Sequence, residues 1–325
     1  MLQMLTGKWV SIGISMAARF GVADELESGP KTAGELAAAT KTNGPALYRL
    51  LRALASVGVF SEGEDGRFTN TPLSDLLRTD AQPGLRNISM MLLDDWHQDV
   101  WRAMPWTVET GKPAPLKVWG KQGFERFTEH PEDAVNFNNA MTDMSTADSA
   151  PTAAAYDFSR FRDIADVGGG LGLLLSEILK KTPGLRGILF EMPYFIDKVR
   201  DSPLLKPYAD RCQVVGGSFF ESVPEADAYI LKHIIHDWDD EKSKAILSTL
   251  RKSIRPGGKL LLAEAVVPPR NEPSFVKILD LEMLMIGGLE RTEQQYRDLY
   301  AAAGFRLDRV VPTQGPMQII EGSPV

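Results

Sequence analysis

The run Asp-Val-Gly-Gly-Gly-Leu-Gly at 166–172 constrains the fold of this chain more than any other feature. An apolar strand over 163–167 is predicted to lead into the glycines, and a leucine-rich amphipathic helix over 171–181 follows them. Glycine accepts positive φ and lets the backbone approach a ligand, and the helix start offers N–H groups that lack intrahelical partners. This order predicts a cradle for a nucleotide; the alternative is a turn that simply reverses the chain.

The spacing of the glycines separates two kinds of nucleotide cradle. Dinucleotide folds use G-x-G-x-x-G, which would place a third glycine at position 173, where the chain has Leu173. Gly168, Gly170 and Gly172 instead fit G-x-G-x-G. This pattern is similar to the loop of S-adenosylmethionine (SAM) methyltransferases, whose cofactor has no pyrophosphate to bind.

An acidic residue stands where nucleotide folds bind ribose. The strand predicted over 187–190 ends at Glu191, 19 residues after Gly172. A carboxylate at this place accepts hydrogen bonds from ribose hydroxyls, and its charge repels a 2′-phosphate. The alternative is a solvated carboxylate before a helix that Pro193 opens.

The composition is typical of a globular protein without a membrane-spanning helix. A length of 325 residues predicts two domains, and no apolar run reaches the ~20 residues of a membrane helix. Cys212 is the only cysteine, which excludes an internal disulfide; with a start that lacks a secretory pattern, it favours the cytoplasm. Cysteine and histidine are too few and wrongly spaced for a zinc site, so we expect no metal. The net charge of −7 argues against nucleic acid and anionic membranes as partners.

The first 90 residues are predicted to form helices followed by a hairpin. Residues 2–20 suggest a helix with one apolar side that needs a burial site, formed by Leu2, Leu5, Trp9, Ile12, Met16 and Phe20. A capping box at Thr32 and Glu35, a second helix over 45–57 and a hairpin turn at 64–66 complete a winged helix-turn-helix pattern. DNA binding is one interpretation of this pattern. Residues 1–90 carry nine basic and nine acidic residues, whereas a DNA reader shows a basic stripe, so the charges argue against it.

The middle of the chain, 84–150, is predicted to be helical and is rich in large apolar side chains. Most of these belong to an ordinary core, although methionine and aromatic residues also suit a pocket for a flat apolar ligand. We expect Phe137 and Met141 from this region, Met285 from 275–290, and Asp237 to contact the substrate.

From residue 156 the chain alternates strands and helices, which predicts an open α/β sheet. Strands are expected near 163–167, 187–190, 212–215, 227–232, 259–265, 305–311 and 317–320. Helices are expected near 171–181, 193–200, 239–254, 274–285 and 292–303. Pro256-Gly257-Gly258 predicts a sharp turn into the fifth strand. The last two strands have a short link and should pair antiparallel, which separates this Rossmann-like sheet from a dehydrogenase fold.

Two histidines compete for a catalytic role at the carboxyl end of the fourth strand, where ligands bind in open α/β sheets. Imidazole titrates near neutrality and suits a general base that takes a proton from a hydroxyl. His236 precedes the acidic run 237–240, which would raise its basicity, and His233 lies three residues earlier. The spacing favours His236 and leaves His233 as the alternative, since either can be a hydrogen-bonded core group.

Six ordered motifs resemble the plant-type small-molecule O-methyltransferase family, which includes caffeic-acid and acetylserotonin methyltransferases and bacterial tailoring enzymes. They are DVGGGLG, FEMP at 190–193, GGSFF at 216–220, LKHIIHDWDDE at 231–241, RPGGKLLLAEAVVP at 255–268 and GGLERT at 287–292. The resemblance implies a winged-helix dimerisation domain over 1–90 and a helical connector over 91–155 that lines the substrate pocket. It also implies a SAM-binding catalytic domain over 156–325 and a homodimer.

The resemblance also implies roles for single residues. His236 is then the general base, flanked by Glu264 and Glu290, because a carboxylate fixes the tautomer of an imidazole and stabilises the imidazolium. Taken alone, Glu264 can also be interpreted as a strand-end acid that faces water, and Glu290 as a helix-cap acid paired with Arg291. The residues implied to hold SAM, and its product S-adenosylhomocysteine, are Asp166, Gly168, Gly170, Glu191, Ser218, Phe219, Lys232 and Trp238. Ser218 departs from the family, which often has aspartate there, and a hydroxyl would bind the adenine amino group more weakly. The segment from 280 to 290 is also slightly short against the family pattern.

The expected activity is methyl transfer from SAM to a hydroxyl of an aromatic or polyketide-like small molecule, without a metal. One alternative is a SAM-binding relative with decarboxylase or hydroxylase chemistry, against which the retained His236, Glu264 and Glu290 argue. Another is a SAM-sensing DNA-binding regulator that uses the winged helix. Salt-dependent binding to random duplex DNA would support that regulator.

Overall fold

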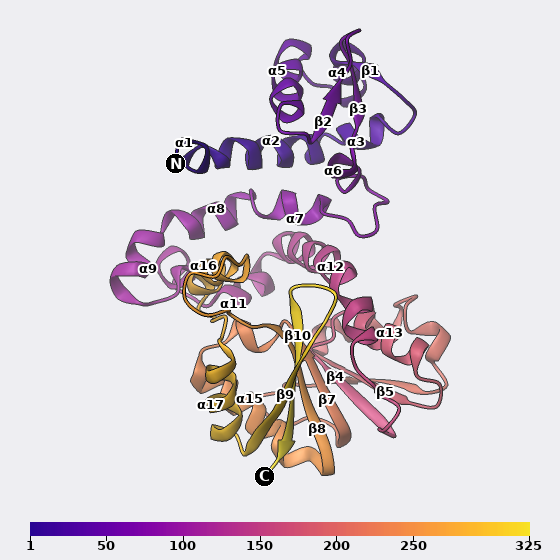
Figure 1. The fold of residues 1–325 in the computed structure, drawn as a ribbon, viewed down its shortest axis with the longest axis vertical. Helices are drawn as coiled ribbons and strands as arrows, with labels where there is room; N and C mark the ends of the chain where they lie inside the picture. The colour runs from indigo at the N-terminus through magenta and orange to yellow at the C-terminus, as the bar shows by residue number, and fades with distance from the viewer. The chain divides into compact units, whose positions relative to one another are not determined.

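The computed structural model describes residues 1–325 apart from the side chains of Phe124 and Thr128. The chain forms two compact units, the first of residues 1–102 and 124–147 and the second of residues 103–123 and 148–325 (Figure 1). None of the helices so described is both long and apolar enough to cross a membrane.

The first unit consists of short helices around a small sheet. Its elements are α1 (Leu2–Leu5), α2 (Gly7–Arg19), α3 (Val22–Glu25), β1 (Lys31–Thr32), α4 (Ala33–Thr40), α5 (Gly44–Ala55), β2 (Phe60–Glu62), β3 (Arg67–Asn70), α6 (Pro72–Asp75), α7 (Arg86–Met91), α8 (Asp95–Arg102), α11 (Gly123–Glu129) and the first part of α12 (Pro131–Ala154). The sheet order is β1-β3-β2, with both pairs antiparallel. The predicted capping box at Thr32 and the hairpin turn before Arg67 are confirmed, and Gly66 in that turn has φ of +74°.

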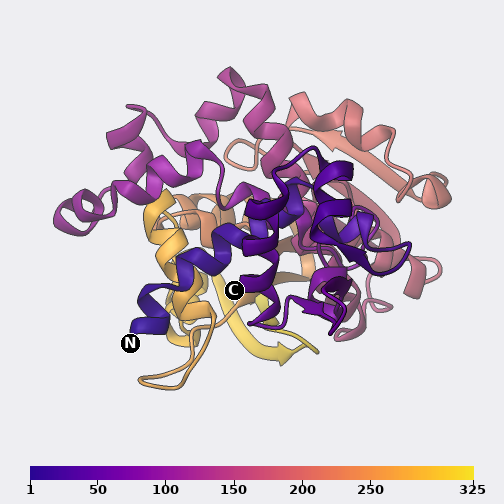
Figure 2. The same ribbon diagram turned by 90° about the horizontal axis from the view of Figure 1, so that it is seen from above.

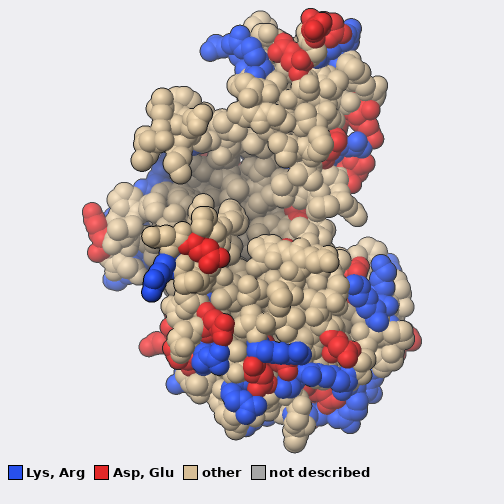
Figure 3. Space-filling view, viewed as in Figure 1, with Lys and Arg blue, Asp and Glu red and all other residues tan. Residues whose placement is uncertain are grey.

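The expected helix over 2–20 is interrupted. It divides at Thr6 into α1 and α2, which Figure 2 shows as successive coils next to the N-terminus. Small residues of α2, including Ala17 and Ala18, face the core of the unit. Most of the apolar side predicted to need burial is exposed in the single chain, at Leu2, Leu5, Trp9, Ile12 and Phe20. Figure 3 shows α1 as a surface without charged groups.

The second unit is a seven-stranded sheet covered on both faces. Its elements are α9 (Met104–Thr110), α10 (Ala114–Val118), β4 (Asp163–Val167), α13 (Leu173–Lys181), β5 (Arg186–Glu191), the 3₁₀ turn η1 (Pro193–Phe195), α14 (Ile196–Arg200), η2 (Lys206–Tyr208), β6 (Cys212–Gly216), β7 (Ala226–Lys232), η3 (Ile235–Asp237), α15 (Asp240–Ser253), β8 (Ile254–Ala265), α16 (Val276–Ile286), α17 (Glu293–Ala302), β9 (Phe305–Pro312) and β10 (Met317–Pro324). All seven predicted strands and all five predicted helices are present. The expected helix over 193–200 begins as the 3₁₀ turn η1.

The order of the sheet is β6-β5-β4-β7-β8-β10-β9. β10 runs antiparallel to both of its neighbours, which confirms the predicted antiparallel last strand. The turn expected at 256–258 lies inside β8, where Gly257 has φ of +77°. The register along β7 and β8 shifts at this point, because Ile254 pairs with Ala226 and Lys259 with Ala228. The residues between form a bulge rather than a separate turn.

The core has one layer on each face of this sheet. Alternate residues of β7 point to opposite faces: Tyr229 joins a cluster with α15 and α17, and Ile230 joins a cluster with α13. Figure 1 shows α15 and α17 on one side of the strands and α13 on the other. Every residue of β4 is buried, as expected for a central strand covered on both faces.

An ion-pair network covers the edge of the sheet where the parallel strands begin. The buried Glu321 pairs with Arg160, Arg309 and Lys259, at 3.1, 2.8 and 3.0 Å. Burial raises the pKa of Glu321, but the hydrogen bonds and charges of these three partners outweigh burial and lower it to about 2. Figure 3 shows blue and red groups intermingled over this part of the unit, so this face has no patch of a single sign.

The place of β10 inside the sheet gives a stability prediction. A Cβ at Gly322 would lie 2.2 Å from Cε1 of the buried Tyr300, so Gly322→Ala should lower the free energy of unfolding by about 1–3 kcal/mol. Gly315→Ala in the same hairpin is the control, because its Cβ would meet only Thr313 Oγ1, at 3.7 Å. Urea unfolding measures both. Equal stability of the two variants would contradict this packing of Tyr300 on β10.

Candidate active site

The candidate site residues come together at one edge of the sheet. Asp166 lies near the end of β4, Glu191 ends β5, Lys232 ends β7, and Glu264 lies near the end of β8. These four strands are parallel, so their carboxyl ends meet at the same edge. Open α/β sheets bind their ligands there.

The glycine turn has the backbone that the sequence predicts. Gly168, Gly170 and Gly172 have φ of +73°, +57° and +83°, a region that side chains rarely adopt. The N–H of Gly168 donates to the carbonyl of Phe190 at 2.8 Å, which continues the pairing of β4 and β5 into the turn. A Cβ at Gly170 would meet no atom within 4 Å among the described residues. The turn therefore presents open space on the side of Gly170.

Glu191 connects this turn to the end of β5. Its carboxylate accepts from the backbone N–H of Gly170 at 3.0 Å and of Met192 at 2.8 Å. Burial raises the pKa of Glu191, and the two backbone bonds oppose that shift. The carboxylate is therefore fixed in orientation and keeps lone pairs for hydroxyl donors.

Asp166 is a buried carboxylate, and among the described residues neither oxygen has a hydrogen-bond partner of normal geometry, although the backbone N–H of Leu175 is near enough to lower its pKa. Burial raises its pKa to about 7, although the charge of Lys232 lowers it. Burial also lowers the pKa of Lys232, against the charges of Asp148, Asp166 and Glu264. A buried acceptor of this kind favours a ligand that brings hydrogen-bond donors or positive charge.

An aromatic group stands beside the ends of β6 and β7. The rings of Phe219 and Phe220 contact Trp238 edge to face, with centroids 6.1 and 5.1 Å away. Ser218 accepts from the N–H of Phe220 at 3.3 Å, so its hydroxyl oxygen belongs to a local turn. These residues offer flat apolar surface and a hydroxyl at the same edge of the sheet.

His236 lies on η3, directly after β7, and is buried among carboxylates. Its Nδ1 is 2.8 Å from Glu290 Oε1, and because a carboxylate accepts, Nδ1 is the donor. Glu264 Oε2 lies 3.9 Å from the same nitrogen, and Asp237 Oδ1 lies 3.5 Å from Nε2. Glu264 Oε1 accepts from the N–H groups of Ile234 and Ile235, at 3.1 and 2.8 Å, which ties the histidine turn to β8.

The charges around His236 decide its basicity. Burial by itself lowers the pKa of His236, but Glu264, Asp237 and the hydrogen bond to Glu290 raise it to about 10. Burial raises the pKa of Glu264 to about 7 and that of Asp237 to about 6, and the charge of His236 opposes both shifts. His236 is therefore strongly basic. Because Glu290 binds Nδ1, Nε2 is the nitrogen that can accept a proton.

His233 has a different environment. Its φ is +55°, its Nε2 lies 3.2 Å from Asp148 Oδ2, and burial lowers its pKa to about 4. Its ring lies 5.1 Å from the ring of His236. Potential ligand atoms of His233, His236 and Glu264 lie within 4.8 Å of one another. The His236 nitrogen on the side of Glu264 is Nδ1, which Glu290 already engages, so the cluster is better explained as a proton-binding group.

The sequence did not indicate Asp148 or Asp280 as neighbours of this site, and it named Arg291 only as a possible partner of Glu290. Asp148 reaches His233 from α12, Asp280 on α16 accepts from the N–H of Glu290 at 2.8 Å, and Arg291 is fully buried beside η3. Asp148 and Asp280 lie on helices far from the histidines in the sequence, and nothing in the local pattern marks them. For Arg291 the signal was its place in the GGLERT motif, directly after Glu290.

The expected substrate contacts fall in different units. Phe137 and Met141 lie on α12 in the first unit, where the ring of Phe137 is 4.8 Å from that of Phe127. Met285 on α16 and Asp237 on η3 belong to the second unit, in which α16 packs against η3. Met285 is fully buried. The substrate role of all four residues stays a prediction.

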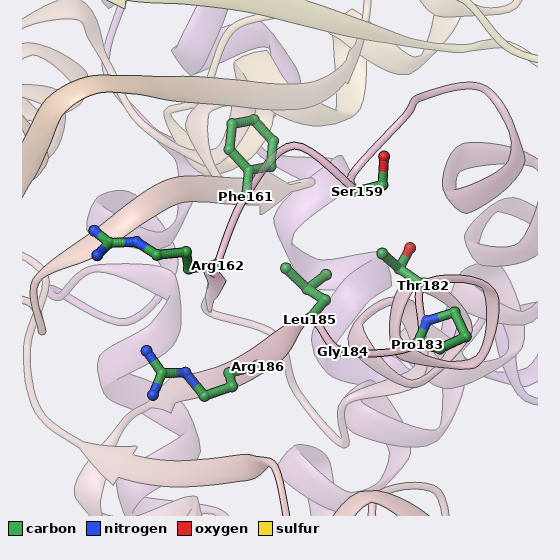
Figure 4. A pocket seen from close by; sticks show the side chains of 8 residues that line it. All are labelled: Ser159, Phe161, Arg162, Thr182, Pro183, Gly184, Leu185 and Arg186. Atoms are coloured by element: carbon green, nitrogen blue, oxygen red, sulfur yellow. The ribbon is translucent and has the colours of Figure 1, made fainter.

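A surface hollow lies at the opposite edge of the sheet, where β4 and β5 begin (Figure 4). Figure 4 shows the side chains of Arg162 and Arg186 extending in the same direction from its wall. Both are paired, Arg162 with Asp227 at 2.9 Å and Arg186 with Asp163 at 3.5 Å. These pairs account for the charge of this hollow, which is separate from the carboxyl edge of the strands.

Comparison with known proteins gives a consistent result over the whole chain. Residues 101–306 match the family model of an O-methyltransferase domain, and residues 2–80 match that of an O-methyltransferase dimerisation domain. The chain is 41% identical to the phenazine O-methyltransferase PhzM of Lysobacter antibioticus, over 100% of this chain and 96% of that protein.

Two crystal structures show the same fold. That of LaPhzM has a TM-score of 0.93 and 41% identity, over 100% of this chain and 98% of the other. That of CalO1, a methyltransferase in calicheamicin biosynthesis in its S-adenosylhomocysteine-bound form, has a TM-score of 0.88 and 35% identity, over 100% and 97%. The predicted resemblance is confirmed: the chain belongs to the O-methyltransferase family and is a SAM-dependent O-methyltransferase.

Proposed function

We propose that this enzyme methylates a hydroxyl group of a flat aromatic or polyketide-like small molecule, with His236 as the general base. The observation that carries the base assignment is the buried pair of His236 and Glu290, 2.8 Å apart, at the carboxyl edge that also bears the glycine turn. The substrate class follows the phenazine relative, whose acceptor is a fused aromatic. The rings of Phe219, Phe220 and Trp238 lie at this edge of the sheet and suit ligands with flat rings.

The residues at the glycine turn fit SAM. The buried carboxylate of Asp166 and the charge of Lys232 suit the amino-acid part, whose ammonium donates and whose carboxylate is anionic. Gly168 and Gly170 let the backbone lie close to it, and Glu191 keeps lone pairs for the ribose hydroxyls. Ser218, Phe219 and Trp238 are proposed to border the adenine. When bound, SAM supplies a methyl group activated by its sulfonium sulfur.

The chain's own residues align the acceptor hydroxyl and take its proton. Nε2 of His236 accepts that proton while Nδ1 stays bonded to Glu290, which fixes the tautomer. The negative charges of Glu264 and Glu290 stabilise the imidazolium that results. Alignment of the reacting groups contributes ~7–11 kcal/mol of barrier reduction, and general base catalysis ~10²–10⁴-fold, so positioning dominates the rate.

A homodimer through the first unit completes the proposal. The exposed apolar side chains of α1 and α2 lie within the segment that matches the dimerisation domain. Contiguous apolar surface of this kind is typical of a protein interface. We accordingly propose domain limits of 1–90 for dimerisation, 91–155 for the connector and 156–325 for catalysis. The 1–90 part then acts in dimerisation rather than in DNA binding.

The base assignment predicts that His236→Ala loses ~10²–10⁴-fold in turnover of a phenolic acceptor and keeps its affinity for S-adenosylhomocysteine. Initial rates measure the first effect and calorimetry the second. His233→Ala is the comparison variant, because His233 is the neighbouring imidazole. Normal turnover in His236→Ala, with turnover lost in His233→Ala, would move the base to His233.

The raised pKa of His236 predicts a pH dependence. The base must be unprotonated, so kcat/KM for a neutral acceptor should rise with pH toward the pKa of about 10. Glu264→Gln removes a charge that favours the protonated ring, so its pKa should fall and the rising limb should move to lower pH. Glu272→Gln, at an exposed position, should leave the profile unchanged. A limb that stays in place in Glu264→Gln would refute this coupling.

The proposed dimer predicts that Trp9→Glu separates the protomers. Trp9 is 67% exposed in the single chain, and burying a glutamate in an apolar interface carries a large desolvation cost. Analytical ultracentrifugation should show a shift from dimer to monomer. The control is Lys8→Glu, an exposed polar neighbour. An intact dimer in Trp9→Glu would place the interface elsewhere.

A further inference from the structure

Arg291 is the largest side chain with no exposure to solvent in the described part of the chain. Its backbone carbonyl accepts from the N–H of Val267 at 2.9 Å, just beyond the end of β8. The side chain leaves this anchored position and enters the space beside η3. A fully buried guanidinium is costly unless its donors are satisfied, so its partners indicate what it does.

The guanidinium binds the backbone on both sides of His236. Nη1 donates to the carbonyl of Ile235 at 3.0 Å, and Nη2 donates to the carbonyl of Trp238 at 2.9 Å. Further bonds go to Asp240 Oδ1, at 3.0 and 2.8 Å, and to Ser243 Oγ at 3.2 Å. The two carbonyls bracket the dipeptide His236-Asp237. One rigid planar group therefore sets the ends of the turn that carries the proposed base.

The backbone before Arg291 closes on the same turn. The N–H of Leu289 donates to the carbonyl of His236 at 2.7 Å. A Cβ at Gly288 would lie 2.1 Å from that carbonyl oxygen, so only glycine permits this approach. Three consecutive contacts thus join the segment 288–291 to the segment 235–238: the close approach of Gly288, the bond from Leu289, and the side chain of Arg291.

Glu290 is part of this join. Its side chain binds Nδ1 of His236, and the next residue binds the backbone around that histidine. The distance between the imidazole and its carboxylate therefore depends on how firmly the two segments are held together. That distance matters because an error of 1 Å in an aligned site can cost ~10²-fold in rate.

We propose that Arg291 is a positioning residue for catalysis, which fixes the His236–Glu290 pair by binding the carbonyls of Ile235 and Trp238. The inference rests on the proposed role of His236 as base. Arg291 acts through His236 and touches neither substrate nor cofactor in this account. A lysine keeps the charge opposite Asp240 but lacks the planar fork that spans both carbonyls.

The test is Arg291→Lys, measured by steady-state kinetics across pH. We expect kcat to fall ~10–100-fold, with the KM for the acceptor and the affinity for S-adenosylhomocysteine within ~2-fold of the wild type. The groups facing His236 are Glu290, Glu264, Asp237 and His233. Only the Glu290 pairing is loosened, so the rising limb of the pH profile should move to lower pH.

Arg211→Lys is the matched control. The Arg211 guanidinium also binds backbone carbonyls, those of Leu179, Thr182 and Leu185, at 2.8, 3.2 and 2.7 Å. It lies just before β6, at the other edge of the sheet. A general loss of stability would appear in both variants, but the change in kcat and pH profile should appear only in Arg291→Lys. The same change in Arg211→Lys would overturn the proposal.

Gly288→Ala decides the case if Arg291→Lys does not fold. Its Cβ forces the two segments apart while Arg291 is kept, so the same fall in kcat and the same shift in pH profile are expected. A folded variant of either kind with wild-type kcat and pH profile overturns the positioning role. Full activity of His236→Ala would instead refute the base assignment, so the two failures can be told apart.

Discussion

The hydrogen bond between His236 and Glu290 is the interaction around which the second unit is organised. Burying an imidazole with three carboxylates is costly, and parts from distant segments hold this group in place. Glu264 is fixed by the N–H groups of Ile234 and Ile235, and Asp280 binds the N–H of Glu290. The sheet therefore also fixes the histidine turn, because the carboxylate of Glu264 at the end of β8 binds the backbone of the turn after β7.

The parts of this protein that could be predicted are those encoded locally. The glycine turn at 166–172 needs positive φ at fixed positions, and only glycine supplies it cheaply, so the spacing alone indicated the cradle. Strands such as β4 are short apolar runs between turn signals, and their limits were predicted within about a residue. The exceptions are β8, which begins five residues before its predicted start at 259, and β10, which ends four residues after its predicted end at 320. Glu191 was found by its distance from the turn, and the backbone bond from Gly170 explains why that distance is constrained.

The parts that could not be predicted depend on contacts between remote segments. Asp148 contacts His233 from 85 positions away along the chain, and Arg291 binds the carbonyl of Ile235, beside His236, from 56 positions away. Hydrophobic periodicity carries no information about such contacts. The sequence predicted a turn at Gly257, where the structure has a bulge, because Pro-Gly-Gly is equally suited to a turn and to a bulge. The proposal of His236 over His233 as base also rests on the three-dimensional structure. Both residues pair with a carboxylate, but only the surroundings of His236 raise its pKa.

The charge of the site explains why we propose that this glycine turn on a Rossmann-like sheet binds SAM and not a dinucleotide. A dinucleotide cradle uses free N–H groups of its turn and helix start to bind a pyrophosphate. In this chain the N–H of Gly170 is already bonded to the carboxylate of Glu191, and Asp166 adds a buried carboxylate nearby. An anionic pyrophosphate would meet both, whereas a sulfonium nucleoside with an ammonium group brings positive charge and donors. Glu191, which we propose to orient the ribose, thus also occupies the N–H that a phosphate would need. One residue would then set both the shape and the charge of the cofactor that fits.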